Sequence, residues 1–235
     1  MIYVGIDDTD TLDDPGTNQL ARHLVRALAG SFTGRMIVRH QLLEDPRVPC
    51  TRKNGCASIL FEPIGPATAD QLTDQIRQIM KSWCPRGSDP GLCVAHAVPP
   101  PVVEWGQRCK CHLTTQAEAR RLASEHGIHL EGLGGTEDGV IGALAAIGLF
   151  VDGNDGRIVY LGPANEDWYD VAGCLSADEI RARGVDEIRI LQSGKIFAAG
   201  TIDIGKRLRP NRRGRKSVLF VTRNENSNWE AARIT

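Results

Sequence analysis

The sequence lacks both a large excess of one charge and a long hydrophobic run. Its 235 residues carry a formal net charge of −1, and 24% of them are charged, so no overall electrostatic attraction to nucleic acid or to a membrane is expected. No basic segment precedes an apolar stretch at the start of the chain, and no apolar stretch is long enough to span a bilayer. We therefore expect a cytoplasmic protein with no membrane partner, in which any affinity for nucleic acid comes from local patches.

A disulfide framework is also lacking, because the chain has seven cysteines, an odd number, and no sign of secretion. A single Cys-x-Cys-His sequence, formed by Cys109, Cys111 and His112, hints at zinc but has no second ligand pair at the usual spacing. Reduced thiols are the better interpretation. The sequence leaves open whether these three residues bind a metal.

The secondary structure that the sequence does contain alternates irregularly between strands and helices. Apolar and β-branched runs predict strands at residues 2–6, 36–43, 56–61, 92–97, 157–161, 187–191, 196–204 and 217–222. Helical spacing of apolar residues predicts helices at residues 17–28, 68–83, 114–126, 139–150 and 176–183. The helix at 139–150 is apolar on every side, so we expect it to be buried between layers or between domains.

Three consecutive prolines, Pro99, Pro100 and Pro101, mark the best candidate for a domain boundary, because such a run is stiff and continues neither helix nor sheet. We expect one domain over residues 1–98 and a second over residues 102–235. The irregular order of elements favours an α+β fold with two α/β sandwich units over one doubly wound sheet.

An acidic cluster, Asp7, Asp8 and Asp10, follows the first predicted strand. Carboxylates this close repel one another unless a cation or donated hydrogen bonds compensate. Mg²⁺ suits such oxygen ligands, because it is usually held by one or two carboxylates together with the phosphates of a nucleotide. The alternative is an acidic turn that only caps the next helix. The place of the cluster at the end of a strand, and the nearby start of a helix at residues 16–18, favour a metal and phosphate site.

A basic turn follows at residues 49–56, where Arg52 offers a planar fork for phosphate oxygens and Lys53 a point charge. Such a turn is by itself most often solvated surface. Together with an acidic metal cluster it indicates phosphoryl transfer, which needs a metal and cationic groups on the same phosphates.

A glycine-rich segment at residues 132–139 precedes the apolar helix and matches neither a Walker loop nor the Rossmann fingerprint. Close packing at the start of the helix is its simplest role. Glu137 and Asp138 lie where the helix dipole favours acids, and they would equally suit a cationic substrate.

A second basic segment near the end of the sequence contains seven positive charges and no acid. It suits a nucleic-acid backbone or a polyphosphate as well as it suits a solvated hairpin, and no interleaved aromatic residues supply a stacking platform. If the partner is tRNA, these side chains are the predicted contacts: Lys206, Arg207, Arg209, Arg212, Arg213, Arg215 and Lys216.

Several ordered blocks of the sequence resemble the archaeal tRNA(Ile2) 2-agmatinylcytidine synthetase family. The blocks are residues 4–10 (VGIDDTD), a threonine followed by Leu20-Ala21, Pro49 with Thr51-Arg52 and Asn54-Gly55, residues 89–91 (DPG) and residues 141–148 (IGALAAIG). They span roughly residues 1–160, and they are specific as a set although each one is short.

The resemblance implies a kinase-like domain that binds ATP and Mg²⁺, followed by a ferredoxin-like domain that contains the apolar helix. Members of the family use ATP to phosphorylate the C2 oxygen of a cytidine in the tRNA anticodon, and the amine agmatine then displaces the phosphate. The residues that the resemblance implies fall into three groups. Asp7, Asp8 and Asp10 would hold the metal; Thr17 would contact phosphate; and Thr51, Arg52 and Asn54 would face the nucleotide. Our own assignment predicts Asp8, Thr17 and Arg52 as catalytic residues and Thr9, Thr51, Lys53 and Asn54 as nucleotide-binding residues.

Two departures from the family are visible in the sequence. The family's threonine pair is present only as Thr17-Asn18, and no four-cysteine zinc module, which the family uses to grip tRNA, exists in these residues. The leading hypothesis is an enzyme that uses ATP and Mg²⁺ to activate a carbonyl oxygen, on tRNA or on a small molecule, with a small amine as the second reactant. The alternatives are a non-catalytic RNA-binding module and a nucleotide-sensing protein.

Overall fold

The fold is that of a computed structural model, which describes residues 1–51, 53–162, 168 and 170–234. The strands are β1 (Ile2–Asp7), β2 (Phe32–Arg39), β3 (Ala57–Pro63), β4 (Gly91–Ala95), β5 (His129–Gly132), β6 (Arg157–Leu161), β7 (Cys174–Ser176), β8 (Glu187–Ile190), β9 (Thr201–Asp203), β10 (Asn211–Arg213), β11 (Lys216–Arg223) and β12 (Trp229–Ala231). The helices are α1 (Thr17–Ala27), α2 (Ala69–Trp83), α3 (Pro100–Arg108), α4 (Gln116–Glu125), α5 (Gly139–Asp152) and α6 (Ala177–Ala182). None of these helices combines the length and apolar character needed to cross a lipid bilayer.

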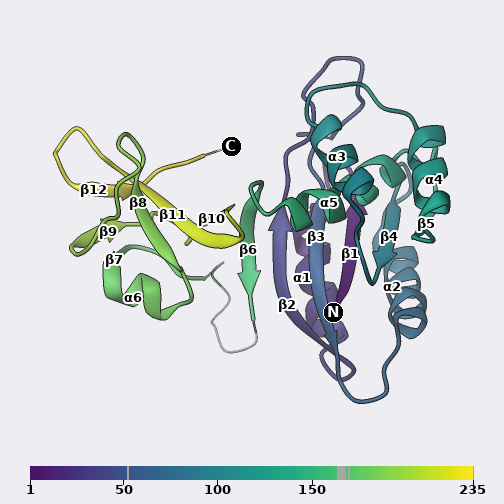
Figure 1. The fold of residues 1–235 in the computed structure, drawn as a ribbon, viewed down its shortest axis with the longest axis horizontal. Coiled ribbons are helices and arrows are strands. Elements are labelled where there is room, and N and C mark those ends of the chain that lie inside the picture. Colours follow the sequence, from purple (N-terminus) through teal and green to yellow (C-terminus); the bar gives the residue numbers. More distant parts are fainter. Residues whose placement is uncertain (52, 163–167, 169, 235) are drawn as a thin grey trace.

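Strands from the whole described chain join in one mixed sheet, with the order β5-β4-β1-β3-β2-β6-β10-β11-β12-β9-β7 and with β8 paired to β11. Figure 1 shows a larger part around β1 to β5 with most of the helices, and a smaller β-rich part formed by the last third of the chain. Strands β6 and β10 connect the two parts. The structure confirms an α+β fold.

Strand β1 lies in the middle of the larger part, antiparallel to β3 and β4. Its alternate side chains Ile2, Val4 and Ile6 are fully buried in a core that also contains apolar side chains of α1 and α2. The opposite face of the sheet packs against α5, which in turn packs against α3. The sheet is therefore covered by helices on both faces.

Helix α5 is buried along nearly its whole length, as its sequence predicts. It lies so close to β1 that a Cβ atom on Gly5 would be 1.9 Å from the carbonyl oxygen of Ala143. Glycine is therefore required at this point of β1, because any larger residue would push helix and strand apart.

The triple proline does not run on as an extended segment. Pro100 and Pro101 form the first turn of α3, where a residue without an N–H group leaves no helical hydrogen bond unmade. Helix α5 comes from the C-terminal side of this point and packs on β1 and β4 from its N-terminal side. The division into domains 1–98 and 102–235 stays a prediction.

The smaller part has a core of its own around Trp168, Ile188 and Leu219, all fully buried. Only residues 201–203 of the predicted strand at 196–204 form a strand, β9. Gly200, with φ of 131°, and Gly205, with φ of 66°, flank this strand, and these backbone angles do not belong to an extended strand.

Candidate active site

The acidic cluster lies at the end of β1, as predicted. Asp7 is the last residue of the strand, and Asp8 has a left-handed backbone conformation with φ of 51°, which turns the chain toward α1. Such a conformation is uncommon for a residue other than glycine, although aspartate adopts it more readily than most residues, and strained backbone of this kind clusters at active sites. Asp7, Asp8 and Asp10 all line a cavity of about 600 Å³.

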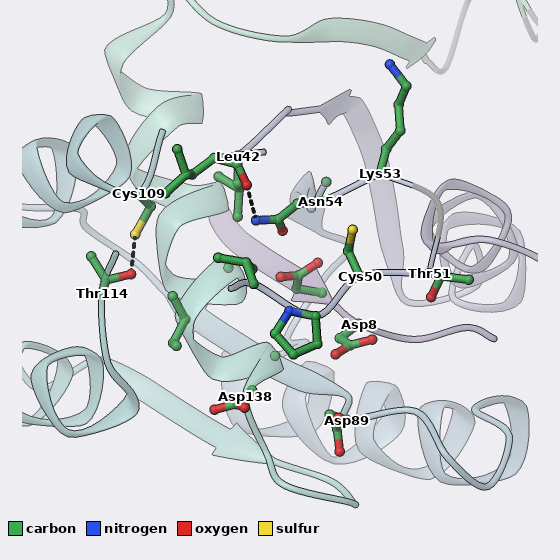
Figure 2. Close-up of a pocket in the computed structure, with 18 of the residues that line it drawn as sticks. Asp8, Leu42, Cys50, Thr51, Lys53, Asn54, Asp89, Cys109, Thr114 and Asp138 are labelled. Carbon is green, nitrogen blue, oxygen red and sulfur yellow. Dashed lines mark hydrogen bonds between the residues drawn. The ribbon is translucent and has the colours of Figure 1, made fainter. Parts of the chain in front are cut away.

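Two further aspartates line the same cavity. Asp89 precedes β4 and Asp138 precedes α5, so β4 and α5 each bring one carboxyl to the end of β1 (Figure 2). The resemblance includes Asp89 as part of a DPG block, and the helix position of Asp138 suggests a cationic substrate, but neither residue is among the predicted ligands. Only the pairing of β4 with β1 and the packing of α5 reveal that they share one site.

The pKa values of the acidic side chains are strongly perturbed. Burial and, to a lesser extent, the neighbouring charge of Asp8 together raise the pKa of Asp7 to about 7. Burial and, to a lesser extent, the charges of Asp89, Asp10 and Asp138 together raise the pKa of Asp8 to about 6. The site therefore concentrates negative charge that a bound cation would compensate.

The donor set fits Mg²⁺ in one particular way. Among the described residues, no three His, Cys, Asp or Glu side chains come together as a metal-binding group. A closed cage of protein ligands is therefore not present. Mg²⁺ needs none, since it keeps several waters and is usually held by one or two carboxylates together with the phosphates of a substrate. Asp8 and Asp10, at the cavity wall, are donors of this kind.

The same finding applies to Cys109, Cys111 and His112, which form no metal-binding group in the described part of the chain. Burial raises the pKa of the Cys109 thiol to about 12, and its sulfur lies 3.5 Å from the hydroxyl of Thr114. Cys109 is thus a protonated thiol in the wall of the cavity.

The beginning of α1 supplies a hydroxyl group to the cavity. Thr17 is the first residue of the helix, and its hydroxyl accepts a hydrogen bond of 3.1 Å from the hydroxyl of Thr9. This leaves the proton of the Thr17 hydroxyl available for another acceptor. Thr9 is fully buried and Thr17 lines the cavity, so Thr9 reaches the cavity only through Thr17.

The turn at residues 49–56 closes the opposite wall. The Thr51 hydroxyl donates to the carbonyl oxygen of Asp10 at 3.2 Å, and the Asn54 amide donates to the carbonyl oxygen of Leu43 at 2.8 Å. Lys53 lines the cavity, but its side chain extends away from the aspartates (Figure 2), and its ammonium group is 3.8 Å from Glu44. Arg52 lies outside the described residues.

The basic segment near the end of the chain does not form one surface. Arg212 is buried, with its guanidinium group 4.4 Å from the ring centre of Phe150, and Lys216 pairs with Glu187 at 2.5 Å. Arg207 and Arg209, by contrast, line a second cavity of about 220 Å³. Residues 211–216 of the segment belong to the hairpin formed by β10 and β11. Arg207 and Arg209 precede this hairpin and are half-buried.

The fold and the acid-lined cavity define a mixed α/β protein with one large polar site at the end of a central strand. Comparisons with known proteins relate this class to TiaS, the tRNA(Ile2) agmatidine synthetase. No protein-family model and no curated protein matches the chain.

Three solved structures illustrate the similarity. A TiaS–tRNA(Ile2)–ATP complex is 21% identical, with a TM-score of 0.55 over 63% of this chain and 36% of that one. A TiaS–tRNA(Ile2)–AMPCPP–agmatine complex is 19% identical, with a TM-score of 0.55 over 77% of this chain and 43% of that one. A tRNA fluorescent labeling enzyme is 23% identical, with a TM-score of 0.55 over 63% of this chain and 35% of that one. The matched part of the chain therefore has the fold of the corresponding part of TiaS, and it spans less than half the length of these proteins.

Proposed function

We propose that this chain is an ATP- and Mg²⁺-dependent enzyme that modifies tRNA by activating a carbonyl oxygen through phosphoryl transfer, after which a small amine replaces the phosphorylated oxygen. The observation that carries this proposal is the convergence of five aspartates and the start of α1 on one cavity. The fold supports it, because it is similar to that of TiaS in complexes with tRNA(Ile2), ATP and agmatine.

Asp8 and Asp10 are the proposed metal ligands, and Asp7 supports them from the end of β1. Burial raises the pKa of Asp8 and repulsion from Asp89, Asp10 and Asp138 raises it further, and a bound divalent cation would relieve this repulsion. When bound, Mg²⁺ supplies neutralisation of the charge that develops on the phosphates during transfer.

The first turn of α1 and the turn at residues 49–56 are the proposed phosphate and nucleotide contacts. Gly16 precedes α1 without a side-chain cap, and although the N–H of Gln19 donates to the Gly16 carbonyl oxygen, the N–H groups of Thr17 and Asn18 point to the same helix start and the hydroxyl of Thr17 adds a donor for an anion. The side chains of Thr51 and Asn54 hold the opposite wall through hydrogen bonds to backbone carbonyl oxygens. Lys53 adds positive charge at the rim of the cavity. Arg52 is proposed to face the phosphates.

The proposed reaction has two steps. The carbonyl oxygen bonds to the transferred phosphorus while the bond from phosphorus to the leaving phosphate oxygen breaks. The amine nitrogen then bonds to the activated carbon, the carbon–oxygen bond breaks, phosphate leaves with that oxygen, and the nitrogen loses a proton. Asp89 and Asp138 form an acidic wall that suits the positive charge of an amine before it reacts.

The test is the analysis of nucleotide products after incubation of the protein with ATP, Mg²⁺, bulk tRNA and agmatine, with each component omitted in turn. We expect ATP consumption that requires Mg²⁺ and increases with tRNA. Asp8→Asn should lower the rate by roughly 10²-fold or more, because it removes charge stabilisation at the reacting phosphates. Asp178→Asn, which makes the same change on a side chain that is 90% exposed in α6, should leave the rate unchanged.

Each other result would point to a different function or site. Turnover that is indifferent to tRNA would replace tRNA with a small-molecule acceptor. ATP binding without turnover would identify a nucleotide sensor. Turnover that survives Asp8→Asn at the rate of the wild type would contradict the assignment of the metal site.

A further inference from the structure

Helix α5 comes so close to the acidic cavity that its backbone contacts the side chain of Asp7. A Cβ atom on Gly142, near the start of the helix, would lie 1.8 Å from Oδ2 of Asp7 and 2.6 Å from its Cγ atom. Gly142 is buried and lines the acidic cavity. The carboxyl group of Asp7 therefore has its place only because residue 142 carries no side chain.

The start of α5 is fixed to the beginning of β4. The N–H group of Gly139 donates to the carbonyl oxygen of Asp89 at 3.0 Å. A Cβ atom on Gly91 would lie 2.1 Å from the carbonyl carbon of Gly139, so strand and helix are in backbone contact. The group that yields to a side chain at position 142 is thus the carboxyl group of Asp7, which rotation about its side-chain bonds can move.

The carboxyl group of Asp7 in turn holds the backbone of Asp8. It accepts a hydrogen bond from the N–H group of Asp8. Asp8 has the left-handed φ of 51°, and such a conformation persists only where its surroundings hold it. This turn places the Asp8 side chain in the cavity with Asp89 and Asp138 (Figure 2). The position of Asp8 thus depends on Asp7, and the position of Asp7 depends on Gly142.

A second carboxyl group of the cavity is held by backbone in a similar way. The N–H group of Thr136 donates to Oδ1 of Asp89, and a Cβ atom on Gly135 would lie 1.8 Å from the same oxygen. Both residues belong to the glycine-rich segment at 132–139, which matches no phosphate-binding loop. The segment and the start of α5 therefore bring backbone, without side chains, up to two acids of the cavity.

We propose that Gly142 is a positioning residue of the acidic cavity: it leaves the space in which the Asp7 carboxyl group lies, and that group holds the turn that presents Asp8 to a divalent cation. The inference rests on the proposed function, because the cation is the one that the nucleotide requires. Asp7 then supports Asp8 and is not itself a ligand of the metal. Groups that orient a metal ligand typically change metal affinity by about 10–100-fold.

The test measures the affinity of nucleotide-free protein for Mn²⁺, a paramagnetic substitute for Mg²⁺ that prefers the same oxygen ligands, by electron paramagnetic resonance. Gly142→Ala should weaken Mn²⁺ binding by roughly tenfold, because the displaced Asp7 carboxyl group no longer holds Asp8. Thermal unfolding of each variant shows whether the protein that is titrated is folded.

Gly148→Ala is the matched control. Gly148 is buried in the same helix, and its Cβ atom would lie 2.1 Å from the carbonyl oxygen of Val102 in α3. This variant therefore strains the packing of α5 on α3, away from Asp7. It should lower Tm and leave the Mn²⁺ affinity of the folded protein unchanged.

Substitutions of Asp7 separate a supporting role from a ligand role, and they do so even if Gly142→Ala does not fold. Asp7→Asn keeps an oxygen that can accept the Asp8 N–H group, so it should bind Mn²⁺ more tightly than Asp7→Ala does. Gly142→Ala added to Asp7→Ala should cause no further loss, because the nearest of the listed Asp7 atoms that remains, Cβ, is 3.1 Å from the new methyl group.

The inference is wrong if Gly142→Ala binds Mn²⁺ as the wild type does, or if Gly148→Ala loses as much affinity. It is also wrong if the losses caused by Gly142→Ala and Asp7→Ala add, or if Asp7→Asn binds no better than Asp7→Ala.

A wild-type protein that binds no Mn²⁺ would contradict the proposed metal site, and chemical denaturation then tests the contact by itself. The contact predicts that Gly142→Ala lowers the unfolding free energy less in the Asp7→Ala background than in the wild type. Equal losses in the two backgrounds would overturn the inference.

Discussion

The contact between β1 and α5 gives a sharp test of the architecture that forms the site, through Gly5→Ala. The added Cβ atom would lie 1.9 Å from the carbonyl oxygen of Ala143, whereas carbon and oxygen atoms in close contact are about 3.3 Å apart. Because the obstacle is helix backbone, the strain cannot be relieved by a change of rotamer. Helix α5 or strand β1 must shift by about 1 Å or more.

Overpacking of this kind costs about 1–3 kcal/mol in the free energy of unfolding. For a chain of this size that corresponds to a fall in Tm of about 2–4 °C for each kcal/mol. The shift also moves α5 relative to β1, and the N-terminal end of α5 forms part of the cavity through Gly139 and Gly142. We therefore expect weaker ATP binding as well as lower stability.

Chemical denaturation and isothermal titration with ATP measure the two effects. Gly30→Ala is the matched control, because no atom lies within 4 Å of the position that its Cβ would take. This control should be neutral or slightly stabilising, since alanine restricts the unfolded chain. The reasoning would be refuted by a Gly5→Ala protein whose unfolding free energy and ATP affinity equal those of the control.

Three more predictions follow from single groups. Burial lowers the pKa of His40, so His40 stays neutral in the folded protein at a pH at which the same residue in the unfolded chain gains a proton. The free energy of unfolding should therefore decrease as pH falls below about 6.5. His40→Asn should remove this dependence of the unfolding free energy on pH. The pKa of Asp7 is raised to about 7 and that of Asp8 to about 6, so the free energy of unfolding of metal-free protein should fall as pH rises from 4 to 7, and Asp7→Asn should reduce this fall and leave only the part below about pH 6 that Asp8 contributes. Alkylation should modify the exposed Cys50 and Cys174 rapidly, and ATP with Mg²⁺ should protect Cys50, which lines the acidic cavity, but not Cys174; equal protection of both would contradict the location of the nucleotide.

The network around His40 explains why its stability effect should be measurable. One ring nitrogen is 2.8 Å from Asp155 and the other is 2.9 Å from the hydroxyl of Ser58. Lys110 pairs with the second oxygen of Asp155 at 2.6 Å. The network joins β2, β3 and the loop before β6, and His40 is completely buried. Its serine, histidine and aspartate therefore tie the sheet together and do not face a substrate.

Elements with strong local signals could be predicted from the sequence. Helix α5 follows from its apolar composition, and α2 from its periodic leucine and isoleucine residues, with Thr68 and Gln71 as a capping box. Helix α3 was not expected, because its prolines suggest an interruption and only their place in the first turn makes them compatible with a helix. Strands β7, β10 and β12 have three residues each, which is too short for an alternating pattern to identify.

The site shows the same division between local and long-range information. Asp7, Asp8, Asp10 and Thr17 are close in sequence, so their common place in the cavity could be predicted. Asp89 and Asp138 reach the cavity through the pairing of β4 with β1 and the packing of α5, which no local pattern reveals.

The seven basic side chains of residues 206–216 do not lie on one surface, for a related reason. Within the hairpin, Arg212 is buried and stacks on the ring of Phe150, while Lys216 is exposed and pairs with an acid. Sequence shows the charges but not the direction of each side chain, because the direction depends on where β10 joins β6 and β11. Arg207 and Arg209 precede the hairpin, and they line the second cavity because the segment passes the start of α1.

The separation of charge across the first turn of α1 gives the site a direction. Carboxylates gather on one side and arginines on the other, although the whole chain has a net charge of only −1. The carboxylates repel one another where they line the acidic cavity, so this is the side that a bound cation would stabilise. The acids beside β1, β4 and α5 therefore determine where the proposed function would hold a metal-bound nucleotide.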